Sequence, residues 1–268
     1  MNLSIGTTFN YDIPIEDQMK MVREVGFTHI CLGGGKIDHS DYLSKTGQLN
    51  LKNLMKMFDL QICSIHAPFV NFDMSNPNPS VDREIIECFK RCIDSALFLE
   101  VRTIVFHPNL PNLTDMNESR KKTLIERINK LLDYIGGENV RLAIENLPKK
   151  FSNELLRYSL KEIKNGNYGF CYDSSHDNLT SEPLKILREY GSRLMATHIS
   201  DNLGENDDHM LPYEGLFKWD KFCELFSTIE LNGIFLLEVE MRNSAFQTTN
   251  SFLKEAFTRG SKLLKQSC

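Results

Sequence analysis

The sequence predicts a closed barrel of eight parallel β-strands, each followed by an α-helix. Three observations lead to this prediction. Short apolar runs alternate with longer amphipathic segments along all 268 residues, which is the order of elements in a parallel α/β sheet. Eight such pairs fit the (β/α)₈ or TIM barrel, which needs about 250 residues. Finally, no glycine-rich phosphate-binding turn follows the first strand, whereas an open, doubly wound sheet usually has one.

The predicted strands are short and rich in β-branched and aromatic residues; they cover 3–9, 28–32, 61–66, 103–107, 141–145, 168–173, 194–198 and 233–238. Continuously apolar runs indicate strands that are buried on both faces. The predicted helices cover 15–25, 49–58, 80–99, 117–135, 152–164, 182–190, 219–230 and 249–264. After Pro79, apolar residues recur at spacings of three and four, and Ser80 is the predicted N-cap. Because we find no linker, we expect one domain over residues 1–268.

Composition narrows the class of protein. The net charge of −5 and a pI near 5.8 give no electrostatic argument for nucleic acid as a partner, although a local basic groove would escape this test. No apolar run approaches the roughly 20 residues of a membrane span. We expect no signal peptide, because the N-terminal residues show no basic segment followed by a small-residue cleavage site. Seven cysteines without a Cys-x-x-Cys pair indicate reduced thiols. We therefore expect a cytoplasmic protein, and a homo-oligomer remains possible because the helical faces could hide an interface.

Titratable side chains stand at the ends of six consecutive predicted strands, namely His66, His107, Glu145, Asp173, His198 and Glu238. In a barrel these positions form one rim, around the mouth where TIM-barrel active sites lie. Each group would cost several kcal/mol if it were buried without a partner. Imidazole and carboxylate without thiolate are typical ligands of catalytic divalent metals. We therefore predict a metal centre at this rim, holding manganese, zinc or cobalt.

These residues resemble the xylose isomerase-like TIM-barrel superfamily, which includes sugar isomerases, ketose 3-epimerases and AP endonucleases. The resemblance covers most of the chain, from residue 66 to residue 238. Its most specific pieces are Glu145-Asn146, Asp173-x-x-His176, His198-x-x-Asp201 and Asp207-x-His209 followed by Glu214-Gly215. Each piece alone is weak, but all of them in this order are specific.

In the isomerases and epimerases, the resemblance implies that one ion is held by the equivalents of Glu145, Asp173, His198 and Glu238. It also gives the two glutamates the transfer of protons at the sugar carbons and places His176 against the substrate as a further catalytic residue. The favoured function is thus a divalent-metal-dependent isomerase or epimerase of a sugar or sugar phosphate, acting through a metal-stabilised enediolate.

The endonuclease members imply an alternative, because they hold three zinc ions with additional ligands equivalent to His66, His107, His176, Asp207 and His209. The chain keeps all of these residue types, so one to three ions are expected, and a zinc phosphodiesterase stays open. Two features favour small molecules. Residues 202–208 lack the basic stretch of the endonucleases, and Asp207-Asp208-His209 with Trp219 resembles the sugar phosphate isomerase/epimerase type.

Two further alternatives are a metal-dependent lyase or dehydratase and a sugar-binding or metal-storing protein without turnover. The complete set of donors with paired glutamates argues against the last. The predicted substrate-binding residues are Phe69, Asn109, Asn146 and Arg242. Lys36 is interpreted as a solvated loop charge, and His29 and His39 as unrelated to catalysis.

Overall fold

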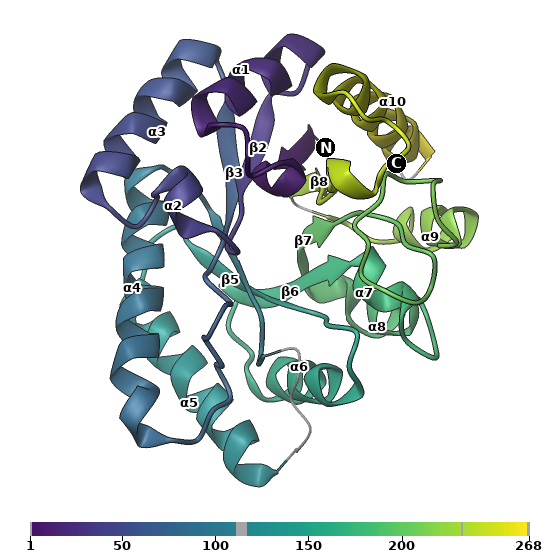
Figure 1. Cartoon of the computed structure of the whole chain (residues 1–268). Helices are drawn as coiled ribbons and strands as arrows, with labels where there is room; N and C mark the ends of the chain where they lie inside the picture. The colour runs from purple at the N-terminus through teal and green to yellow at the C-terminus, as the bar shows by residue number, and fades with distance from the viewer. Residues whose placement is uncertain (1, 111–116, 232, 267–268) are drawn as a thin grey trace.

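A computed structural model describes residues 2–110, 117–231 and 233–266 (Figure 1). Within these residues, eight strands run parallel: β1 (Asn2–Gly6), β2 (His29–Leu32), β3 (Gln61–His66), β4 (Thr103–Phe106), β5 (Arg141–Glu145), β6 (Tyr168–Asp173), β7 (Leu194–His198) and β8 (Ile234–Leu237). Their order is β7-β6-β5-β4-β3-β2-β1-β8. The ring nearly closes just past β7, where Ile199 donates its N–H to the carbonyl of Leu236 at 2.8 Å. The predicted TIM barrel is confirmed.

Helices surround the strands on the outside (Figure 1). They are α1 (Ile15–Val25), α2 (Ile37–Ser40), α3 (Lys45–Phe58), α4 (Asp82–Phe98), α5 (Glu118–Ile135), α6 (Lys150–Glu162), α7 (Ser174–Asn178), α8 (Lys185–Tyr190), α9 (Trp219–Phe226) and α10 (Thr249–Gln266). Their apolar faces cover the outward side chains of the strands. Within the described residues, none of these helices is both long and apolar enough to span a bilayer.

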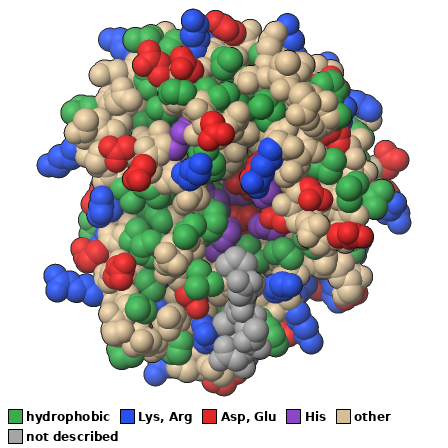
Figure 2. All heavy atoms as spheres, in the orientation of Figure 1, with side chains coloured by type: hydrophobic (Ala, Val, Ile, Leu, Met, Phe, Trp, Pro, Cys, Tyr) green, Lys and Arg blue, Asp and Glu red, His purple; other side chains and the backbone are tan. Residues whose placement is uncertain are grey.

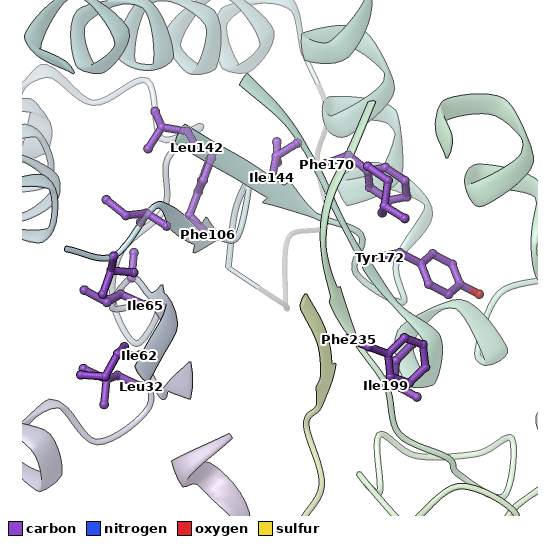
Figure 3. Packing of buried hydrophobic residues seen from close by; sticks show 14 of the residues in the cluster. Leu32, Ile62, Ile65, Phe106, Leu142, Ile144, Phe170, Tyr172, Ile199 and Phe235 are labelled. Atoms are coloured by element: carbon purple, nitrogen blue, oxygen red, sulfur yellow. The ribbon is translucent and has the colours of Figure 1, made fainter. Parts of the chain in front are cut away.

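The core has two parts that differ in side-chain size. Between the strands and the helices, large side chains such as Ile65, Phe106 and Phe235 are fully buried (Figure 3). Inside the barrel, Val105 packs with the smaller side chains of Ala143, Cys171 and Ala196 and forms a separate cluster. TIM-barrel interiors are usually filled by bulky branched residues. Because the interior side chains of this barrel are small, they leave space along its axis.

Several predicted boundaries are wrong. The first strand ends at Gly6, because Thr7–Phe9 forms a 3₁₀ turn at the mouth of the barrel. Ser80 is not an N-cap: α4 begins at Asp82, and the side chain of Asn78 accepts the N–H of Ser80 at 3.0 Å. The short helices α2 and α7 were not predicted, since four or five residues are too few for an apolar periodicity.

Candidate metal centre

The predicted donor side chains meet in the C-terminal mouth of the barrel. Figure 2 shows histidine and carboxylate atoms gathered in a hollow near the middle of this face. Six come from the strand ends, His176 from α7, and Asp207 and His209 from the segment between β7 and α9. Most are deeply buried, with His198 and Asp173 having no exposed surface. Charged and polar groups gathered at such depth need partners.

Glu145, at the end of β5, lies at the centre of this cluster. Its Oε2 is 3.0 Å from Nε2 of His66, 3.3 Å from Nδ1 of His198 and 3.5 Å from Nε2 of His107. Its Oε1 is 3.2 Å from Nδ1 of His176. Four histidines from four different elements therefore converge on one carboxylate.

Backbone carbonyls determine which ring nitrogen carries the hydrogen in three of the histidines. The Nδ1 contacts are His66 to the Ala67 carbonyl at 2.8 Å, His176 to the Asn146 carbonyl at 2.8 Å and His209 to the Glu238 carbonyl at 3.0 Å. Because a carbonyl oxygen only accepts, each Nδ1 must be the donor. In the neutral ring, Nε2 then presents a lone pair to the interior of the site.

Each of these lone pairs faces a carboxylate oxygen. Nε2 of His66 lies 3.0 Å from Glu145, and Nε2 of His176 and of His209 lie 2.9 and 3.0 Å from the same oxygen of Asp207. Two acceptors at this distance repel unless a cation, either a proton or a metal ion, lies between them. A backbone carbonyl that holds the outer nitrogen while the inner one faces carboxylates is the usual surrounding of a metal-binding histidine. The residues therefore fit a metal.

The donor atoms form three groups, of which the first and last share two residues; in each group all atoms lie within 4.8 Å of one another: His66, Glu145 and His198; His176, Asp207 and His209; and Glu145, Asp173, His198 and Glu238. The last group is the set of four predicted from the sequence. Among the described residues, Oδ2 of Asp173 and the Nδ1 of His198 that faces Glu145 and Glu238 are buried without a hydrogen-bond partner. Buried oxygen and imidazole donors without protein partners are suited to manganese, zinc or cobalt.

Burial and neighbouring charges give the acidic side chains of the cluster different pKa values. Burial raises the pKa of Asp173 to about 7, and the charges of Glu145 and Asp207 add to the effect. Burial also opposes the charge of Glu238, but the charge of His198 prevails and lowers the pKa of Glu238 to about 2. The carboxylates thus ionise only with positive charge beside them, which is the electrostatic condition that favours cation binding.

Asn146, predicted to bind substrate, has its side-chain amide occupied by the backbone. Its Nδ2 donates to the carbonyl of Asp173 at 2.9 Å, and its Oδ1 accepts the N–H of Asp173 at 2.8 Å. These two bonds fasten the end of β6 to the end of β5. The contacts make Asn146 a positioning residue for Asp173, and a contact with substrate stays a prediction.

The other three predicted substrate residues lie in different surroundings. Phe69 stacks on the ring of His107, with centroids 4.7 Å apart, and forms one wall of the site. Asn109 is buried, and its Nδ2 donates to the Leu110 carbonyl. The side chain of Arg242 is 76% exposed and forms an ion pair with Glu240. Direct contact of these residues with substrate also stays a prediction.

Two features beside the centre were missed by the sequence analysis. A cavity of about 490 Å³ lies at the ends of β1, β2 and β8, lined among others by Tyr11, Lys36 and Arg242. A Cβ atom at Gly35 would lie 3.4 Å from the ring of Phe69 and 3.5 Å from the hydroxyl of Tyr11, so Tyr11 lies near the wall of the metal centre. Burial, together with the charge of Glu238, raises the pKa of Tyr11. At Gly34, a Cβ atom would lie 2.3 Å from the Ala67 carbonyl oxygen. Arg242, predicted from the sequence to bind substrate, lines this cavity. The aromatic residue after the first strand and the glycine run 33–35 are further sequence signals for these features.

The loop that carries Asp207 and His209 is held by Asp201. This fully buried carboxylate accepts hydrogen bonds from the backbone N–H groups of Asn202, Tyr213 and Phe217 and from the indole N–H of Trp219, all between 2.8 and 3.1 Å. A Cβ atom at Gly215 would lie 2.3 Å from it. The motif residues Asp201, Gly215 and Trp219 therefore build the loop scaffold, and Trp219 belongs to the core.

The fold and the placement of these donors agree with the result of sequence comparison. The sequence model of the xylose isomerase-like TIM-barrel family matches residues 19–262. The chain belongs to this family.

The individual relatives and solved structures share less than 30% sequence identity with this chain. The uncharacterised protein y4fM of Sinorhizobium fredii is 28% identical over 239 residues, covering 78% of this chain and 76% of the relative. Among solved structures, a D-tagatose 3-epimerase-like protein superimposes with a TM-score of 0.81 at 19% identity, covering 100% of this chain and 98% of the other. The IolI protein with a bound zinc atom superimposes with a TM-score of 0.77 at 17% identity, with the same coverage. At these identities the structures show a shared fold.

Proposed function

We propose that this chain is a divalent-metal-dependent isomerase or epimerase of sugars or sugar phosphates. One observation carries the proposal: the carboxylates of Glu145 and Glu238 reach the same nitrogen of His198, at 3.3 and 2.8 Å. The two glutamates come from β5 and β8, which lie nearly opposite each other in the ring of strands. Two carboxylates that enter one site from opposite sides can act on both faces of a substrate carbon.

In this proposal, Glu145, Asp173, His198 and Glu238 hold the ion. When bound, a divalent metal supplies a Lewis acid that polarises neighbouring oxygens of the substrate. The zinc in the IolI structure supports a metal in this fold, and the unpartnered donors described above support one in this chain. The other two donor groups, His66 with Glu145 and His198, and His176 with Asp207 and His209, leave the number of ions between one and three.

The proton-transfer role falls to Glu145 and Glu238. Although burial opposes ionisation, neighbouring histidine charges hold the pKa of Glu145 well below its ordinary value and that of Glu238 near 2. Both side chains are therefore proton acceptors at neutral pH. In epimerisation, one glutamate takes the proton from a carbon next to the carbonyl and becomes protonated. The other, which has first taken a proton from solvent, delivers that proton to the opposite face, and exchange with solvent restores both side chains. We assign to His176, 3.2 Å from Glu145, a contact with a substrate oxygen.

The cavity beside the centre is a suitable space for the rest of the substrate. Its volume of about 490 Å³ falls within the roughly 300–1,000 Å³ range of small-molecule sites. In its lining, Tyr11 offers an apolar ring surface for a carbon chain, and Lys36 and Arg242 offer donors to hydroxyl or phosphate oxygens. The ring of Phe69, which stacks on His107, offers a further apolar surface at the metal centre. The similarity to the D-tagatose 3-epimerase-like structure supports a ketose as substrate.

The experiment that tests the function is hydrogen exchange at carbon. The metal-loaded protein is incubated in deuterium oxide with individual ketohexoses and their phosphates, and deuterium at the carbons beside the carbonyl is measured by NMR. We expect incorporation and the appearance of an epimer or isomer for at least one substrate, and neither after treatment with a chelator. Deuterium incorporation that is unchanged by the chelator would contradict a metal-dependent mechanism.

A zinc phosphodiesterase is the second candidate, because the group of His176, Asp207 and His209 is a separate place for an ion. Figure 2 argues against a nucleic-acid substrate on this face, where basic and acidic side chains are interspersed. Counting metals per chain in the purified protein distinguishes the two. One ion supports the isomerase, whereas three zinc ions with cleavage of a duplex containing an abasic site would support the phosphodiesterase.

A further inference from the structure

A second cavity opens at the other end of the barrel. Its volume is about 280 Å³, and its lining includes His29, Gln61, Thr103 and Arg141, which are the first residues of β2, β3, β4 and β5. The candidate metal centre occupies the C-terminal ends of the same strands. The cavity is therefore a separate site at the N-terminal mouth.

The small side chains in the interior of the barrel make this cavity possible. It extends inward as far as Ser64, Ala196 and Thr197, which are buried and have short side chains. Where bulky residues usually fill a barrel of this kind, the layer formed by residues 105, 143, 171 and 196 leaves the N-terminal end hollow. Three hydroxyl-bearing residues, Ser64, Thr103 and Thr197, are part of its lining.

Two arginines supply the charge of this cavity. Arg141 lies at the mouth, where its Nε donates to the Thr103 hydroxyl and its Nη2 to the Met195 carbonyl, both at 2.9 Å. Both of these acceptors are neutral. Arg102, an exposed residue, lines the same cavity. Burial, with the neighbouring charge of Arg102 as a smaller cause, lowers the pKa of Arg141 to about 10.

The other titratable groups of the lining leave this positive balance in place. Glu100 is exposed, and its carboxylate is bound by the ammonium of Lys52 at 3.3 Å. His29 contacts the hydroxyl of Thr28 at 2.8 Å and Oε1 of Gln61 at 3.1 Å. Burial lowers the pKa of His29, which keeps its ring neutral. The cavity therefore combines two guanidinium groups, several hydroxyls and one carboxylate that already has a cationic partner.

We propose that this cavity binds a small oxyanion of the phosphate class, either free phosphate or the phosphate group of a small metabolite, through Arg102, Arg141 and the neighbouring hydroxyls. Guanidinium groups present pairs of N–H donors that match phosphate oxygens, and Ser64 and Thr103 add hydroxyls that can donate. A negative charge between the two arginines would relieve their repulsion. The site is independent of the proposed isomerase function, because it shares no residue with the metal centre.

The proposal is tested by titrating the metal-loaded protein with inorganic phosphate in a calorimeter. Arg141→Gln and Arg102→Gln are compared with Arg188→Gln, which removes an exposed arginine from α8, away from the cavity. We expect each cavity variant to bind phosphate about tenfold more weakly or worse, since a bond to a charged group is lost. The control variant should bind as the unchanged protein does.

Backbone NMR locates the bound phosphate. Because the metal centre can also attract phosphate, the amide signals of residues 61–64 and 195–197 are followed during the titration. We expect them to shift in the unchanged protein, and to shift in Arg102→Gln only at phosphate concentrations about tenfold higher or more. Affinity and spectra unaffected by Arg102→Gln would overturn the proposal, and this exposed position decides the matter even if Arg141→Gln fails to fold. Tighter binding of glycerol phosphate than of free phosphate would identify a metabolite as the ligand, and equal binding would identify phosphate itself.

Discussion

The two ends of the barrel interior carry opposite charges on the same strands. On β5, the inward side chains change from Arg141 through the small Ala143 to Glu145, over about 13 Å at roughly 3.3 Å per residue. The N-terminal end presents guanidinium and hydroxyl groups around a cavity. The C-terminal end presents carboxylates and imidazoles whose lone pairs face one another.

The difference lies in how each end satisfies its charges. At the C-terminal end, carboxylate oxygens and imidazole nitrogens lie close together. A cation is needed there to offset the repulsion between their lone pairs. At the N-terminal end, Arg141 donates to the neutral Thr103 hydroxyl and Met195 carbonyl, so these contacts do not require a bound ion. The C-terminal end also has a long loop, residues 199–218, which brings two more donors, Asp207 and His209. We therefore expect substitutions at the C-terminal end to affect chemistry and metal content, and those at the N-terminal end to affect anion binding.

The largest effect is expected for Glu145→Gln. The amide keeps the size of the side chain but cannot accept a proton, so turnover of the substrate identified by deuterium exchange should fall by about 10²- to 10⁴-fold. Circular dichroism should be unchanged, and the metal content should be measured in the same samples. Glu138→Gln, an exposed change outside the barrel mouth, is the matched control and should be fully active. Activity retained in Glu145→Gln would exclude the proposed proton-transfer role.

The sequence was sufficient to predict the barrel and to bring the donors together. Strands such as β4 are continuously apolar, and the position that ends each run is fixed by the run itself, so His107, Glu145 and Asp173 could be placed on one rim. Buried parallel strands leave few other arrangements. Whether these residues bind metal and turn over substrate is a matter for the experiments above.

The N-terminal cavity, the state of His66 and the role of Trp219 could not be predicted, because they depend on contacts between residues far apart in the chain. Arg141 precedes an apolar run and would be interpreted as a solvated charge, because nothing in the sequence shows that the barrel is hollow beneath it. The state of His66 depends on a carbonyl whose position only the fold determines. Trp219 could be a sugar-binding surface or part of the core until its bond to Asp201 is seen.

A smaller effect, on metal affinity, is expected for Asn146→Ala. The substitution removes both amide contacts to the backbone of Asp173 while leaving every proposed ligand in place. Loss of such an orienting partner typically weakens metal binding by about 10- to 100-fold, which competition with a chelator would measure. Asn53→Ala, an exposed change on α3, should leave the affinity unaltered. Equal affinities in the two variants would show that Asp173 needs no support from β5.

The smallest effect concerns the loop that distinguishes the C-terminal end from the other. Trp219→Phe keeps an aromatic ring in the core but removes the indole N–H that donates to Asp201 at 2.8 Å. The free energy of unfolding should fall by about 2 kcal/mol, the value of a hydrogen bond to a charged group, as measured by denaturant unfolding. Tyr213→Phe removes an exposed bond to Gln266 in the same region and should cost less than about 0.5 kcal/mol. Similar losses in both variants would mean that the loop is held by packing of its aromatic residues, and that Asp201 contributes little to placing Asp207 and His209.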